Sequence, residues 1–112
     1  MSVALRNRSA RRGKVLRLAT SEVAALLPEV PAWTLEGAQL GRSYHFAGFP
    51  ALVVFVNRLA ALAQAEDHHP DFAAHFDRLD VTLTTHDVAG LTENDFIVAA
   101  KLDALFEAAP SP

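Results

Sequence analysis

Three of the five histidines stand where secondary-structure elements are expected to end. His68 and His69 are adjacent and precede Pro70, and His86 follows the β-branched run at residues 81–85. Imidazole accepts and releases protons near neutral pH, so histidines on loops suit general acid–base catalysis. Pro70 restricts His69 to extended backbone angles, which fixes the direction of its side chain. These three histidines are therefore the first candidates for chemistry.

Other chemistries find less support. The chain has no cysteine, no Gly-x-Ser-x-Gly sequence and no glycine-rich phosphate motif, which disfavours nucleophilic catalysis and nucleotide binding. A metal-dependent hydrolase stays open because imidazole binds zinc. However, adjacent histidines rarely share one ion, and no HxH or HxxxH pair occurs, so we expect no metal. A plain surface role for the histidines is the remaining alternative. His45 and His75, which alternate with core positions in expected strands, receive no role.

The apolar pattern of the first half predicts a helix, a hairpin and a longer helix. The first helix starts with Thr20 as N-cap and ends at Pro28. Strands at residues 32–36 and 39–46 flank a turn at Gly37. The helix at residues 49–66 has Pro50 in its first turn. Its apolar side chains recur every three or four residues, and they are Leu52, Phe55, Val56, Leu59, Leu62 and Ala63.

The second half predicts another hairpin and a final helix. A short strand at residues 72–76 contains Phe76 as a core aromatic, residues 77–78 turn the chain, and a strand from Val81 stops near His86. The last helix begins at Thr92, with Asp95 placed to complete a capping box. Its buried stripe is Val98, Leu102, Leu105 and Phe106. The order α-β-β-α-β-β-α predicts an α+β fold: a four-stranded antiparallel sheet with three helices on one face.

Charge divides the chain into two parts. Residues 1–17 form an acid-free basic segment, and residues 18–112 form a single domain with four basic and thirteen acidic residues. We expect a flexible basic tail, with weak RNA binding or a transit function as alternatives. The acidic body does not favour nucleic-acid binding, and no apolar run of 18 residues indicates a membrane span. The absence of cysteine and an Ala- and Arg-rich composition indicate a bacterial cytoplasmic protein.

Several short motifs become specific when they are taken together. His69 and His86 are 17 residues apart, and His86 and Asp95 are nine apart. The motifs are Glu66-Asp67-His68-His69-Pro70-Asp71, Phe76, Thr84-Thr85-His86, Gly90-Leu91-Thr92-Glu93-Asn94-Asp95, Phe46-Ala47-Gly48-Phe49 and Phe55-Val56-Asn57-Arg58. In residues and spacing they resemble the pterin-4a-carbinolamine dehydratases, over residues 18–105.

The resemblance implies the same α+β fold in a homodimer or homotetramer. It implies dehydration of 4a-hydroxytetrahydrobiopterin to quinonoid dihydropterin, a step that recycles the cofactor of aromatic amino-acid hydroxylases and so links the protein to such a hydroxylase. The pterin is the substrate, and no cofactor is expected. By resemblance, His68 and His86 are candidate acids and His69 binds the pterin and acts as base.

The same resemblance assigns further residues to the site. It places Asp95 in a supporting catalytic role, whereas the capping box alone would make it structural. Substrate contacts are expected from His69, Pro70, Asp71 and Thr85.

Two positions depart from the family pattern. Gln64 stands where an acidic residue is usual, with Glu66 or Asp67 as possible substitutes from another face of the helix end. Gly48 stands where an aspartate often caps the long helix. This replacement lowers helix stability by roughly a few tenths of a kcal/mol.

A second hypothesis is a binding protein on the same fold. Some relatives act as transcription coactivators and others resemble Rubisco assembly factors, and such proteins would use the sheet edge or a helical surface. Retention of the three histidines and Asp95 favours catalysis, because a pure scaffold does not require them.

Overall fold

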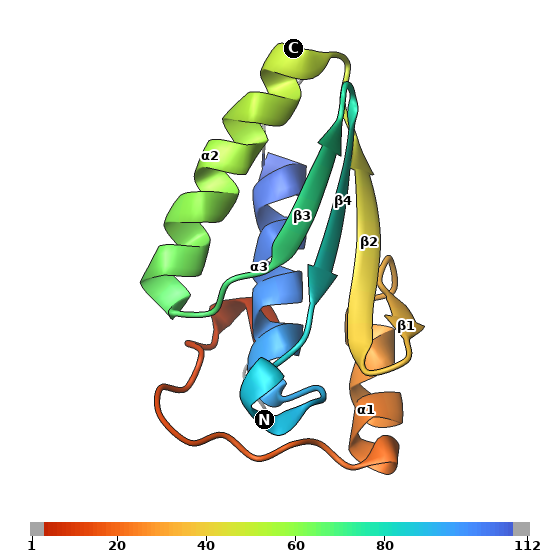
Figure 1. Ribbon diagram of the computed structural model, residues 1–112, viewed down its shortest axis with the longest axis vertical. Helices are drawn as coiled ribbons and strands as arrows, with labels where there is room; N and C mark the ends of the chain where they lie inside the picture. The colour runs from red at the N-terminus through yellow and green to blue at the C-terminus, as the bar shows by residue number, and fades with distance from the viewer. Residues whose placement is uncertain (1–3, 109–112) are drawn as a thin grey trace.

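A four-stranded antiparallel sheet forms the centre of the computed structural model, which describes residues 4–108 (Figure 1). The strands lie in the order β1-β2-β4-β3, and they are β1 (Thr34–Glu36), β2 (Gln39–His45), β3 (Asp71–His75) and β4 (Arg78–Leu83). The helices are α1 (Thr20–Leu26), α2 (Phe49–Glu66) and α3 (Glu93–Ala108), with 3-10 turns η1 (Leu5–Asn7), η2 (Leu27–Glu29) and η3 (His86–Val88). The predicted α+β class and element order are confirmed.

The helix α2 begins and ends at the residues that the sequence predicts. Pro50 occupies the first turn after the N-cap Gly48, which makes no side-chain cap bond. One stripe of α2 is buried, and it consists of Leu52, Phe55, Leu59 and Ala63. Within the described chain, α2 is also long and apolar enough to cross a membrane by length and composition. Helices in the core of a globular domain can have the same length and composition. The buried stripe of α2 is typical of such a core helix, which packs one face against a sheet.

The core lies between the sheet and the helices. On β2 and β4 the side chains alternate, so that Leu40, Tyr44, Leu79, Val81 and Leu83 are buried. From α3 the core receives Phe96, Ile97, Val98, Ala99 and Leu102, while Leu105 and Phe106 are partly buried. The predicted apolar stripe of the last helix is therefore confirmed. At the start of α3, consecutive residues are buried, so the helix is enclosed there on several faces.

A polar cluster joins β2 to α3. The carboxylate of Asp103 accepts hydrogen bonds from Trp33 Nε1 at 3.0 Å and from Tyr44 Oη at 2.7 Å, and Arg42 Nη1 donates to it as well. The Arg42 guanidinium also lies 4.2 Å from the centre of the Tyr44 ring. Burial raises the pKa of the Tyr44 phenol, and the hydrogen bond to Asp103 adds to this.

Two local predictions are wrong. Helix α1 has Ala19 rather than Thr20 as N-cap, and Glu22 Oε1 accepts the Ala19 N–H at 2.8 Å. The β3–β4 turn is made by Phe76 and Asp77, because Arg78 already belongs to β4. Phe76 has a φ of 58° and is 71% exposed, so it is a turn residue and not a core aromatic. Positive φ is uncommon for a bulky side chain, which hides this turn from sequence patterns.

The basic N-terminal segment lies along the body, unlike the solvated extension expected for residues 1–17. Residues 1–3 of that segment, and 109–112 of the predicted domain, lie outside the described residues. Leu5 is buried against α3, and Arg8 Nη1 donates to Glu93 Oε1 at 2.9 Å. Leu18 N–H donates to Leu91 O at 2.8 Å. The N-terminal segment is held by buried apolar area and by backbone hydrogen bonds. The charge pattern of the segment indicates neither of these interactions.

Candidate active site

The predicted site residues lie at one end of the sheet. The end of α2, the start of β3, the turn η3 after β4 and the start of α3 meet there, at the bottom of the view in Figure 1. Each of these chain segments is a loop or an element end, where side chains are free to face a ligand. The antiparallel pairing of β3 with β4 brings the loop before β3 beside the loop after β4.

The end of α2 directs His68 inward. Asp67 follows the last helical residue in the left-handed conformation, with a φ of 50°. This turn lets the His68 N–H donate to Ala63 O at 3.1 Å, which closes the helix end. His68 Nε2 then lies 2.6 Å from Asp95 Oδ1, and the two side chains are 11% and 0% exposed. The sequence separation of the pair is 27 residues.

The Asp95 carboxylate is fully engaged. Its Oδ2 accepts from Thr85 Oγ1 at 2.8 Å and from the Thr92 backbone N–H at 2.9 Å. Thr85 Oγ1 also lies 2.8 Å from Thr92 Oγ1. Since each hydroxyl has one proton, Thr92 donates to Thr85, and Thr85 donates to Asp95. A carboxylate oxygen accepts hydrogen bonds, so the tautomer of His68 that fits this contact carries a proton on Nε2 and presents Nδ1 elsewhere.

Asp95 therefore combines the two roles that the sequence left open. The bond from Thr92 N–H is the reciprocal contact of a capping box at the start of α3. The bond to His68 orients an imidazole. Different oxygens of the carboxylate serve these two contacts, so neither displaces the other.

His69 lies outside this buried group. Its Nε2 is 3.1 Å from Gln64 Oε1, in an exposed setting. Gln64 thus reaches a histidine from the position where an acid was expected, and accepts a hydrogen bond without supplying charge. Neither suggested substitute does so, because Glu66 bonds to Ala10 N–H and Lys101, and Asp67 pairs with Arg12.

His86 is exposed, like His69. Its Nε2 lies 3.8 Å from Asp71 Oδ2, and both side chains are more than three-quarters exposed. The loop that holds His86 is closed at its base, where Thr85 N–H donates to Gly90 O at 2.9 Å. Asp71 is the first residue of β3 and stands two positions after His69. The contact therefore links the loop of His69 and Pro70 to the loop of His86.

A cavity of about 540 Å³ adjoins the buried pair. The body lines it with His68, Thr85, Asp67, Asp87, Val88 and Asn94, and the N-terminal segment lines it with Arg11, Arg12, Gly13, Lys14 and Val15. The volume is within the range of small-molecule sites, and His68 and Thr85 are among the residues that line it. Among the described residues, no three His, Asp or Glu side chains gather as metal ligands.

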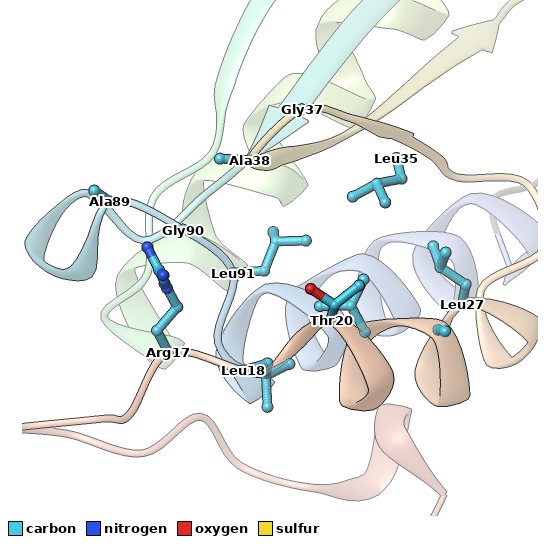
Figure 2. A pocket seen from close by; sticks show the side chains of 12 residues that line it. Arg17, Leu18, Thr20, Leu27, Leu35, Gly37, Ala38, Ala89, Gly90 and Leu91 are labelled. Atoms are coloured by element: carbon cyan, nitrogen blue, oxygen red, sulfur yellow. The ribbon is translucent and has the colours of Figure 1, made fainter.

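A second hollow is more apolar. It measures about 340 Å³ and lies between α1, the β1–β2 turn and the loop at residues 89–91 (Figure 2). Leu18, Leu27, Leu35 and Leu91 line it, and the stem of Arg17 fills the space beside Gly90. None of the predicted site residues borders this hollow, whereas His68 and Thr85 line the first cavity, so we place the candidate site there. His69, Pro70, Asp71 and His86 are not among the residues that line that cavity.

Sequence reasoning assigned no site role to three residues of this end. Thr92 holds the hydroxyl of Thr85, Gln64 bonds to His69, and Asn94 bonds to the N-terminal segment. Thr92 was expected only as a helix cap, and Gln64 only as a departure from the family pattern. Asn94 gave no signal, because its partner in the chain is 83 residues away.

Comparison with known proteins gives a consistent result. Residues 16–105 match the model of the family described as pterin 4 alpha carbinolamine dehydratase. A Stenotrophomonas maltophilia protein named as such a dehydratase is 50% identical over 102 residues, covering 89% of this chain and 88% of its own. A Xanthomonas campestris protein of the same name is 48% identical over 99 residues, covering 87% and 84%.

A solved structure has the same fold. The crystal structure of a protein described as a transcriptional coactivator/pterin dehydratase from Brucella melitensis superposes with a TM-score of 0.76 and 35% identity. The match covers 80% of this chain and 98% of that one.

Proposed function

The chain belongs to the pterin-4a-carbinolamine dehydratase family of hydro-lyases, and from that premise we propose that it dehydrates a 4a-hydroxytetrahydropterin by histidine acid–base catalysis. In this reaction the C4a–O bond breaks and the hydroxyl leaves as water after it receives a proton. A ring N–H proton is lost, and the product is the quinonoid dihydropterin. One acid and one base are sufficient, and no electrons are exchanged with another molecule.

The observation that carries the proposal is the buried pair of His68 and Asp95 at the wall of a cavity. The carboxylate stabilises a protonated imidazole and fixes which ring nitrogen faces Asp95. We assign His68 as an acid for the departing hydroxyl, with Nδ1 as the nitrogen available to the substrate. Thr85 shares the cavity wall and is a candidate contact for the pterin.

The exposed histidines complete the proposed site. His69 is the proposed base and pterin contact, held by Gln64 through a neutral hydrogen bond. His86 is a second proposed acid, and Asp71 lies within ion-pair distance of it. Pro70 and Asp71 join these two histidines and are proposed substrate contacts. Their exposure is consistent with groups that meet a ligand arriving from solvent.

Replacing His69 by alanine tests the central assignment. We expect His69→Ala to lower kcat/KM for 4a-hydroxytetrahydrobiopterin by about 10²-fold or more, the contribution of one acid or base. The substrate is generated by a coupled hydroxylase, and its dehydration is followed by stopped-flow absorbance. His86→Ala is expected to lose activity similarly, with an altered pH dependence near neutrality.

His45→Ala is the matched control, because His45 is an exposed histidine on β2 away from the site. It should keep full activity. Unchanged turnover in His69→Ala would remove the acid–base assignment, and no dehydration by the unmutated chain would favour the binding-protein hypothesis.

The remaining parts of the proposal concern the setting of the enzyme. We propose that it works in the cytoplasm, without a metal, and returns the pterin to an aromatic amino-acid hydroxylase. We also propose a homodimer or homotetramer. Apolar side chains exposed on α2 and at β3 support it: Phe49, Val53, Val54, Phe72 and Phe76. Sedimentation equilibrium measures the assembly, and full activity after chelator treatment would support the absence of a metal.

A further inference from the structure

The N-terminal residues 8–15, here called the strap, run across the end of the molecule that carries the site (Figure 1). The strap is tied at its start by the Arg8–Glu93 ion pair of 2.9 Å. Beyond its end, Leu18 N–H donates to Leu91 O. The start of α3 and the residues just before it therefore hold the chain on both sides of the strap.

The strongest tie lies next to Asp95. Asn94, which is 5% exposed, accepts the Arg11 N–H at 2.8 Å and donates its amide N–H to Arg11 O at 2.8 Å. Ala10 N–H donates to Glu66 Oε1 at 2.8 Å. These bonds use the strap's backbone, so its position does not depend on its side chains. The strap side chains are thus available to face the cavity.

The charges along the strap are not equivalent. Arg11 lies 3.7 Å from Glu93, and Arg12 lies 3.5 Å from Asp67 while donating to Ala65 O at 3.1 Å. Lys14 follows Gly13, whose φ of 78° turns the chain, and it lines the cavity with Arg12. Within residues 4–108, Lys14 has no ion pair or hydrogen bond. It is the cation of the cavity wall that no carboxylate neutralises.

An unneutralised cation is informative in this chain. Residues 18–112 carry four basic and thirteen acidic residues, so an anionic ligand approaching the body meets an unfavourable field. Asp67 and Asp87 add to that field inside the cavity. A cation on the wall offsets it where a negatively charged group would lie.

We propose that the strap is the substituent-binding wall of the site and that Lys14 selects pterins whose ring substituent carries a carboxylate or a phosphate. This inference rests on the proposed function for the orientation of the ligand. His68, the proposed acid, lines the same cavity as Lys14. With the reacting C4a beside His68, the substituent that distinguishes natural pterins, which is attached to the same ring, lies within reach of the strap.

Equilibrium binding of stable fluorescent pterins tests the proposal separately from turnover. The probes are pterin-6-carboxylate, 6-hydroxymethylpterin phosphate and neutral 6-hydroxymethylpterin, titrated into the full chain. We expect Lys14→Gln to weaken binding of the anionic probes about two- to fivefold, as for an ion pair with water access, and to leave the neutral probe unchanged. Lys14→Arg should restore the anionic preference, and the preference should shrink with added salt.

Arg58→Gln is the matched control, because it removes one positive charge from the exposed face of α2 outside the cavity. An equal change for anionic and neutral probes in Lys14→Gln, or an equal effect of Arg58→Gln, would overturn the proposal. The result for the carboxylate and for the phosphate probe separates the two anion classes.

Turnover is measured in parallel on 4a-hydroxytetrahydrobiopterin, whose substituent is neutral. If the unmutated chain did not dehydrate this substrate, that result would contradict the proposed function. It would leave the Lys14 proposal to be judged by probe binding, which involves no reaction.

Discussion

Helix α3 carries two carboxylates that are each surrounded by hydrogen-bond donors, yet their partners differ in kind. Asp95, near its start, bonds to His68, Thr85 and the Thr92 N–H. Asp103, further along, bonds to Trp33, Arg42 and Tyr44. The first set includes an imidazole, a side chain whose two ring nitrogens can donate or accept a proton. The second consists of an indole, a guanidinium and a phenol.

This difference makes the Asp95 group a candidate for catalysis and gives the Asp103 cluster a structural role. Arg42 is permanently charged, an indole N–H only donates, and burial raises the pKa of the Tyr44 phenol. The Asp103 cluster can therefore hold β2 to α3 but has no proton to exchange. Both groups border a cavity, so the Asp95 group differs by its imidazole, the side chain most often used in general acid–base catalysis.

The largest expected effect comes from Asp95→Asn. We expect kcat/KM to fall by about 10²-fold or more, because an amide neither stabilises a protonated His68 nor accepts from all three donors. Stopped-flow dehydration kinetics measure the loss, and circular dichroism checks that the fold persists. A variant that folds and retains activity would place Asp95 with Asp103 as a purely structural residue.

Asp103→Asn should reverse the pattern. Activity is expected to stay within about twofold, while the free energy of unfolding falls by about 1–3 kcal/mol, because Arg42 loses its charged partner in a partly buried place. Urea unfolding followed by fluorescence of Trp33, the single tryptophan, measures this loss. A large drop in kcat with unchanged stability would contradict the division between the two carboxylates.

The smallest expected effect is that of Tyr44→Phe. Loss of the phenol's bond to Asp103 should cost about 0.5–1.5 kcal/mol at neutral pH. The phenol of the unfolded chain ionises above a pH of about 10. In the folded chain its raised pKa keeps the proton on, so the unmutated protein loses stability as pH rises past that value.

The phenylalanine variant lacks this ionisation, so its stability should decline less and the two curves should converge in alkali. Because Tyr44 is the only tyrosine, phenolate absorbance reports its titration directly. Phenolate formation near the ordinary tyrosine pKa in the folded protein would show that the phenol is not held by burial and Asp103.

Much of this architecture was predictable because it depends on local patterns. The three- and four-residue spacing of Leu52, Phe55 and Leu59 places α2, and the alternation around Val81 places β4. Gly37 turns the first hairpin with a φ of 62°. Phe76 shows where local patterns fail. An aromatic residue at the end of an alternating run is expected in the core, but Phe76 lies in the β3–β4 turn and is exposed.

For the candidate site, the sequence proposed residues but not the contacts between them. Motif spacing selected His68, His69, His86 and Asp95, but it did not say which histidine meets the carboxylate. The sequence marked Gln64 only as a departure from the family pattern. In the structure, the end of α2 places the Gln64 side chain within hydrogen-bond distance of His69. Such contacts join residues whose distance depends on how separate elements pack.

The sequence by itself determined the elements, the two hairpins and the placing of three histidines at element ends, because backbone preference and apolar periodicity act over a few neighbouring residues. Only the tertiary structure decided that Asp95 bonds to His68 and not to another imidazole, and that the strap closes the cavity. The sheet brings the end of α2 to the start of α3, and the backbone of Arg11 finds its partner in Asn94. Contacts between such distant residues exist only after the core has formed.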